Sequence, residues 1–257
     1  MRQTFSGDGL SNSAILSLCL DDYGWLWIGT CDGVNIANGA VVHPFKSLFP
    51  ERTLSGNVIE SIKDGGKDYM WFLTNYGLDL FDTKTWDLKT FTQFHGQEVI
   101  WVNKKTNRMY VVAEDSGLHV YDPAKDSDFR FVGKFDRSHS LLRCIMERDG
   151  MLWAVFNEGI YVYDLSKKPD GNDGKLTPVK EYRDIKTKFA KCQDDELLTI
   201  SPEGDICEIM SDGNVRKIAS MGAAATSRGR ISNMVHDRQG NFFVSFFTDG
   251  VLWVGLN

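Results

Sequence analysis

The chain lacks the features that nucleic-acid-binding and membrane-spanning proteins require. Its 29 lysines and arginines are scattered without a basic run, and the net charge is −6 with a pI of about 5.4. Because nucleic-acid binding depends on a concentrated basic surface, we expect no nucleic-acid partner. No apolar stretch approaches the roughly 20 residues that cross a bilayer, so we expect no direct membrane insertion by this chain. The first residues also show no signal peptide.

Cysteine and histidine are few and are not spaced as ligands. The cysteines at positions 19, 31, 144, 192 and 207 include no CxxC pair and no Cys/His spacing typical of zinc. The five histidines show neither ligand spacing nor a Ser/His/Asp order, and no Asp-x-Asp-x-Asp calcium loop occurs. We therefore expect no metal, no cofactor and no catalytic residue. Cys19, Cys144 and Cys192 fall in predicted strands, where a buried thiol acts as a small hydrophobe.

What the chain does have is a cassette that recurs about six times. The clearest copy reads Asp-Tyr-Gly-Trp-Leu-Trp-Ile-Gly-Thr from Asp22 to Thr30 and is followed by Gly33 and Val34. The aromatic or apolar anchors of the copies are 39–45 residues apart: Trp27, Trp71, Tyr110, Trp153, Leu198 and Phe243. Such a period with strand-like content is typical of propeller blades, each a small antiparallel sheet. We therefore predict an all-β fold, a β-propeller of about six four-stranded blades.

Each blade is predicted to repeat one order of strands and turns. In the first two copies the inner strands are expected over residues 11–18 and 55–62. An Asp-x-x-Gly hairpin turn follows, since Asp accepts hydrogen bonds from nearby backbone N–H groups and Gly tolerates positive φ. The second strand carries the anchor, and the third has the two-residue period of a strand. Trp27, Trp71 and Trp153 share one position of the repeat, so we expect them in the core between blades.

The two ends of the chain predict how the ring closes. The sixth copy stops after its third strand, at 251–254, and residues 2–5 precede the first inner strand where an outer strand is expected. The N-terminal strand is therefore predicted to complete the last blade. The alternative is a piece of a longer ring with seven blades. A single domain over 1–257 then has blades at approximately 6–48, 49–95, 96–136, 137–183, 184–222 and 223–257, the last completed by 1–5.

One end of the predicted ring collects polar loops. These are the turns between the second and third strands, together with the links from each outer strand to the next inner strand. We call this end the rim. Its mixed charge suits a polyhydroxylated or zwitterionic ligand, and Tyr76, its one aromatic residue, is a candidate for stacking on a sugar. The ligand-binding candidates on the rim are Asn12, Asp32, Asn57, Tyr76, Glu114, Asp115, His139, Asn157, Glu158, Lys188, Arg228 and Asp249.

The first copy resembles a known family. Gly-Leu-Ser-Asn-Ser at 9–13 and Asp-x-Gly-x-Leu-Trp-Ile-Gly-Thr-x-x-Gly-Val at 22–34 closely resemble the two-component regulator propeller repeat. The match decays in the third, fifth and sixth copies, where Tyr, Leu and Phe replace the tryptophan. The resemblance implies the periplasmic sensor of an inner-membrane hybrid two-component protein, often a sensor of oligosaccharides. The family's sensors are usually longer than this chain and define no universal binding residues.

The favoured hypothesis is a sensor module that is not itself an enzyme. It would bind an oligosaccharide or another small polar ligand and transmit its occupancy to a histidine kinase in the remainder of the parent protein, and so regulate transcription. A homodimer is one partner considered. The first alternative is a protein-interaction or structural propeller without a small ligand, although the Gly-His…Trp-Asp signature of WD-repeat scaffolds is missing. The second is a propeller glycosidase or lyase, which would need two rim carboxylates across a sugar-sized gap.

Overall fold

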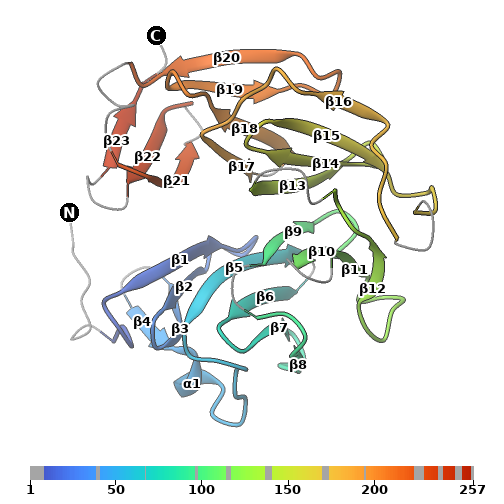
Figure 1. Cartoon of the computed structure of the whole chain (residues 1–257). Coiled ribbons are helices and arrows are strands. Elements are labelled where there is room, and N and C mark those ends of the chain that lie inside the picture. Colours follow the sequence, from blue (N-terminus) through green and yellow to red (C-terminus); the bar gives the residue numbers. More distant parts are fainter. Residues whose placement is uncertain are drawn as a thin grey trace. The chain divides into compact units, whose positions relative to one another are not determined.

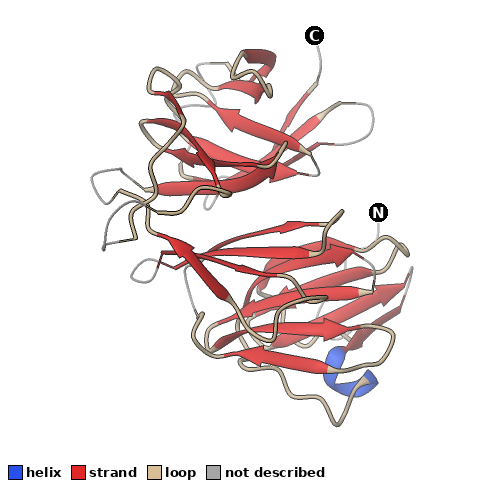
Figure 2. Cartoon of the chain, turned by 90° about the vertical axis from the view of Figure 1, so that its right-hand side faces the viewer, coloured by secondary structure: helices blue, strands red, loops and turns tan. Residues whose placement is uncertain are grey.

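The computed structural model describes residues 9–38, 41–66, 68–95, 98–113, 117–136, 141–169, 174–193, 195–222, 229–236, 240–246 and 251–255. These residues form six antiparallel sheets, five with four strands and the last with three (Figure 1). Figure 2 shows strands throughout, with one short helix, α1 (Phe45–Leu48). The prediction of an all-β propeller with six blades is confirmed. The chain divides into two compact units, Met1–Phe131 and Val132–Asn257, which are described separately.

The strands run in chain order through the six blades. The first two blades contain β1 (Ile15–Leu20), β2 (Leu26–Thr30), β3 (Gly33–Asn38) and β4 (Val41–Pro44), then β5 (Ile59–Gly66), β6 (Tyr69–Thr74), β7 (Gly77–Asp82) and β8 (Leu88–Phe91). The third and fourth contain β9 (Val99–Asn103), β10 (Arg108–Ala113), β11 (Gly117–Tyr121) and β12 (Arg130–Gly133), then β13 (Leu142–Arg148), β14 (Met151–Phe156), β15 (Gly159–Asp164) and β16 (Lys180–Tyr182). The last two contain β17 (Phe189–Gln193), β18 (Glu196–Ile200), β19 (Asp205–Ile209) and β20 (Val215–Ser220), then β21 (Ile231–His236), β22 (Phe242–Phe246) and β23 (Val251–Val254).

The repeated tryptophans form the core between successive blades. Trp27 and Trp71 lie on the second strands of their blades and are 4 % and 0 % exposed. The Trp27 ring packs 5.7 Å from that of Phe72 in the next blade, and the Trp71 ring lies 5.9 Å from that of Tyr121 in the third. Each large flat side chain therefore fills the space between two twisted sheets, which confirms the predicted role of the anchor.

The Asp-x-x-Gly turn of the first blade works as predicted. The Asp21 carboxylate accepts hydrogen bonds from the backbone N–H groups of Tyr23 and Trp25 at 3.0 and 2.9 Å. Its second oxygen accepts the indole N–H of Trp27 at 2.8 Å. Gly24 closes the turn at φ +84°, a value that a side chain would disfavour. One carboxylate thus orients both the turn and the core tryptophan that follows it.

The predicted inner strands were wrong at their beginnings. They start four residues later than expected, at Ile15 and Ile59, because the preceding polar residues make other hydrogen bonds. The Asn12 side-chain oxygen accepts the N–H of Ala14 at 2.7 Å, a local turn that competes with the strand ladder. Ser11 and Ser55 are bonded to side chains of the second and third strands of their own blades.

The ends of the chain leave the predicted closure untested. The described part of the sixth blade has the three strands β21, β22 and β23. Residues 2–5, which were expected to complete it, lie outside the described residues. The single domain over 1–257 and its blade limits likewise stay predictions.

Candidate functional site

Seven of the predicted rim residues fall in the described part of the chain. In the first unit, Asp32, Asn57 and Tyr76 are exposed, and Asn12 is partly buried. The N–H of Gly33 donates to the carbonyl of Asn57 at 2.7 Å, so the rim loops of the first two blades are joined. Five other candidates lie outside the described residues and stay predictions: Glu114, Asp115, His139, Arg228 and Asp249.

In the second unit, the structure brings Asn157 and the link before β17 together. The Asn157 side-chain oxygen accepts the Nε–H of Arg143 at 2.6 Å, and its carbonyl accepts the N–H of Thr187 at 3.2 Å. Glu158 and Lys188 are both partly buried beside these contacts in sequence. Asn157 therefore stabilises the link before β17 through these two hydrogen bonds.

A cluster of hydrogen-bonded polar side chains, which we call the latch, recurs at the rim of the first two blades. It consists of a serine before the inner strand, a threonine on the second strand and a buried polar residue on the third strand. In the first, Ser11 bonds to Thr30 and to Asn35, whose side chain is fully buried. In the second, Ser55 bonds to Thr74 at 2.8 Å and donates to Asp79, also fully buried, at 2.8 Å. Repetition of the latch at equivalent positions indicates a structural role.

The two latches differ in charge. Thr90 also donates to the Asp79 carboxylate, at 2.6 Å. Burial nevertheless raises the pKa of Asp79 above its ordinary value, and the hydrogen bonds from Thr90 and Ser55 offset only part of that rise. Asn35 occupies the equivalent place in the first blade without a charge.

The first unit also contains a pocket at the other end of its sheets. It has a volume of about 550 Å³, within the range of small-molecule sites. It lies at the β1–β2 turn, the β5–β6 turn and the β7–β8 link, opposite the predicted rim. The lining residues are Asp21, Tyr23, Trp25, Trp27, Ile36, Leu48, Phe49, Asp68, Phe81, Thr83 and Lys84.

The wall of the pocket joins two blades through one hydrogen bond. The hydroxyl of Tyr23 donates to the Asp68 carboxylate at 2.6 Å, and this bond, with the charge of Asp68, raises the pKa of Tyr23. Asp68 itself has φ +72°, which points to a strained backbone at this turn. Tyr23 and Trp25 are 71 % and 37 % exposed, so aromatic surface faces solvent here.

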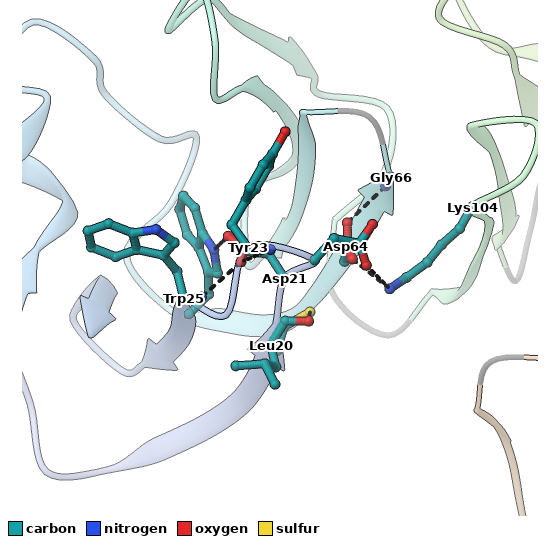
Figure 3. Close-up of polar contacts among 10 residues, drawn as sticks. Leu20, Asp21, Tyr23, Trp25, Asp64, Gly66 and Lys104 are labelled. Carbon is teal, nitrogen blue, oxygen red and sulfur yellow. Dashed lines mark hydrogen bonds and ion pairs between the residues drawn. The ribbon is translucent and has the colours of Figure 1, made fainter. Parts of the chain in front are cut away.

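Beside the pocket, an ion pair ties the second blade to the third. Figure 3 shows the Lys104 ammonium reaching the Asp64 carboxylate, at 2.5 Å. Asp64 also accepts the N–H of Gly66 at 2.8 Å, and Asp22 lies 3.7 Å from the same ammonium. The hydrogen bond and the charge of Asp64 raise the pKa of Lys104 against the opposing effect of burial. The Asp64 carboxylate thus joins the backbone at the end of β5 to Lys104 of the third blade.

The candidate residues predicted from the sequence all lie on the rim, so none of them lines this pocket. A usable signal was present, since Lys67 stands in the second copy where Tyr23 stands in the first. An aromatic residue that does not recur in the repeat is freer to serve function than one that does. The contribution of Asp68, 45 positions from Tyr23, had no such signal.

Comparison with known proteins identifies the repeat. Residues 9–32 match the family model described as two component regulator propeller. The first blade thus carries a repeat of the two-component regulator propeller family, and the fold around it is a propeller. A comparison with curated proteins found no match.

Solved structures share the fold at low sequence identity. The extracellular domain of BT4673 from B. thetaiotaomicron is similar in two structures. In the first, the domain belongs to a protein described as a one-component system. The TM-score is 0.65 and the identity 18 %, and the alignment covers 98 % of this chain and 34 % of that chain. The other describes a hybrid two-component system (TM-score 0.51, 17 % identity, 96 % and 42 %). The WD40 propeller of Doa1 is also similar (TM-score 0.62, 13 % identity, 93 % and 78 %). The chain spans less than half the length of either BT4673 domain.

Two other features are absent from the described residues. No helix among them is long and apolar enough to cross a membrane. No group of three or more His, Cys, Asp or Glu side chains in the same part of the chain could hold a metal ion.

Proposed function

We propose that this chain is the extracytoplasmic ligand-sensing module of a two-component signalling protein. The regulator propeller repeat at 9–32 and the likeness to extracellular sensor domains support this proposal. In this proposal the domain itself is not catalytic. The histidine kinase lies in the remainder of the parent protein, on the other side of the inner membrane.

The proposed ligand is an oligosaccharide, and the pocket of the first unit is the observation that carries this choice. A sugar ring has apolar C–H faces and a rim of hydroxyls. Tyr23 and Trp25 offer exposed aromatic surface for the faces. The Asp68 carboxylate and the Lys84 side chain, both in the lining, offer an acceptor and a donor for the hydroxyls.

The rim residues form a second proposed contact surface. Asn12, Asp32, Asn57 and Tyr76 lie on rim loops of the first unit and could hold a longer glycan or another part of the sensor. Occupancy would signal by a population shift: a ligand that prefers one arrangement of the sensor biases the kinase by its differential affinity for that arrangement.

A thermal-shift screen against a panel of oligosaccharides tests the proposal. A ligand at about 100 times its dissociation constant stabilises the native state by roughly 2.7 kcal/mol. For a chain of this size that corresponds to a rise in the unfolding midpoint of about 5–10 °C. A flat panel on a cooperatively melting chain would contradict the proposal of a glycan site within this chain.

A homodimer is a second proposal. Light scattering on the purified chain tests it: a dimeric wild type would support it, and a monomeric wild type would contradict it.

A further inference from the structure

Two cysteines of neighbouring blades lie in contact. Cys144 belongs to β13 in the fourth blade, and Cys192 belongs to β17 in the fifth. Their Sγ atoms are 3.5 Å apart, although 48 positions separate the two residues. Both strands belong to the second unit and pack against each other. We propose that these two thiols are a disulfide site, which an oxidant of the disulfide class converts into a covalent link between the fourth and fifth blades.

The surroundings hold the two sulfur atoms together. The Cys192 thiol donates to the carbonyl of Ile145 at 3.2 Å, so it is already bonded to the strand that carries Cys144. A disulfide requires an S–S distance of about 2.05 Å. The two atoms need to approach by roughly 1.5 Å, which rotation of the side chains can supply in part.

The two thiols differ in their exposure to solvent. Cys144 is 8 % exposed, whereas Cys192 is partly buried. Cys192 is therefore the group that meets the oxidant from solvent, and Cys144 is the group that completes the bond.

The chemistry balances with a disulfide oxidant of the form RS–SR. The thiolate of Cys192 attacks one sulfur of the oxidant, forms a mixed disulfide and releases RS⁻. The thiolate of Cys144 then attacks the Cys192 sulfur, forms the Cys144–Cys192 bond and releases the second RS⁻. The two thiol protons are taken up by the two released thiolates. The two cysteines are oxidised and the oxidant is reduced to two RSH.

The other three thiols serve as internal controls. Burial raises the pKa of Cys19 to about 11, so that thiol stays protonated and unreactive. Burial also raises the pKa of Cys207. Cys31 is exposed and can take up the oxidant as a mixed disulfide. None of the three should join the link.

Formation of this disulfide in the cell rests on the proposed extracytoplasmic location, because disulfides persist there. The chemistry itself is tested on the purified chain. A failed glycan screen therefore leaves it standing, and a failed oxidation leaves the glycan proposal standing.

The experiment is oxidation of the folded chain with oxidised glutathione, followed by digestion with trypsin and Glu-C and mass spectrometry. Cleavage should give peptide 144–147 linked to peptide 192–196, free of Cys207, with the loss of two hydrogens. Oxidation should also raise the unfolding midpoint by roughly 5–10 °C. Cys207→Ser should retain both effects, and Cys144→Ser and Cys192→Ser should lose both.

Two results would overturn the proposal. One is oxidation of the folded wild type that yields glutathione adducts without the linked peptides. The other is a link that forms only after unfolding in urea. Both results come from the wild-type chain, so they do not depend on whether a serine variant folds.

Discussion

The hydroxyl of Tyr23 donates a hydrogen bond to the carboxylate of Asp68 at 2.6 Å and so joins the first hairpin turn of one blade to that of the next. Tyr23 is largely exposed, yet its hydroxyl is engaged with a carboxylate that would repel a tyrosinate. The bond therefore couples the shape of the pocket wall to the ionisation of one phenol.

The first prediction follows from that coupling. The hydrogen bond to Asp68 and its charge raise the pKa of Tyr23, so Asp68→Asn should let this phenol ionise at lower pH. Ultraviolet titration of tyrosinate absorbance, with Tyr23→Phe subtracted to isolate the one residue, measures the change. An unchanged Tyr23 titration in Asp68→Asn would contradict the contact.

The second prediction concerns the charged latch. Because burial raises the pKa of Asp79, the folded state binds its proton more tightly than the unfolded state does. The stability this confers is fully present below the unfolded pKa of about 3.9 and is lost as pH rises through the raised folded value.

The unfolding midpoint of Asp79→Asn should therefore rise relative to that of the wild type between pH 4 and pH 7. The expected rise is about 2–4 °C, which corresponds to about 1 kcal/mol in the free energy of unfolding. Thermal melts followed by circular dichroism at both pH values test this. Asn35→Asp in the first blade is the reverse change and should lose stability over the same interval. An advantage of Asp79→Asn that shrinks toward neutral pH would refute the reasoning.

The third prediction concerns the core anchor. Trp71 is fully buried between the second and third blades, so Trp71→Ala should cost about 3–5 kcal/mol in the free energy of unfolding. Trp86→Ala is the matched control, because Trp86 is 56 % exposed, and it should cost less than about 1 kcal/mol. Urea unfolding followed by circular dichroism compares them, and equal costs would speak against the packing described here.

The fourth prediction concerns the pair of Lys104 and Asp64. The Asp64 side chain is only 6 % exposed and the Lys104 side chain 43 %. Lys104→Met leaves a buried carboxylate without its cation and should cost about 1–3 kcal/mol. Asp64→Asn in addition should restore part of the loss, because it removes the charge that needs a partner. A double-mutant cycle in urea measures the coupling, and strictly additive costs would mean that the pair contributes nothing.

The sequence was sufficient for features that depend on one repeat. The spacing of the aromatic or apolar anchors predicted the six blades, because one cassette recurs in each blade. Asp21 with Gly24 predicted a hairpin turn, because the groups involved are neighbours along the chain. The starts of the inner strands were missed because the bonds of Ser11 reach Thr30 and Asn35 on later strands.

Features that depend on two blades were not predictable in the same way. The pocket needs Tyr23 and Asp68, and the proposed disulfide site needs Cys144 and Cys192. In both pairs the partners come together only through the packing of one sheet on the next, which the period alone does not specify. The rim candidates stay predictions.

We propose that a sugar binds in the pocket of the first two blades. The most direct measurement is saturation-transfer NMR of the oligosaccharide panel with the wild type, Trp25→Ala in the pocket and Tyr76→Ala on the rim. The account predicts transfer to a sugar in the wild type and in Tyr76→Ala, with an affinity at least about tenfold weaker in Trp25→Ala, which corresponds to about 1.4 kcal/mol. Loss of binding in Tyr76→Ala with full binding in Trp25→Ala would contradict it.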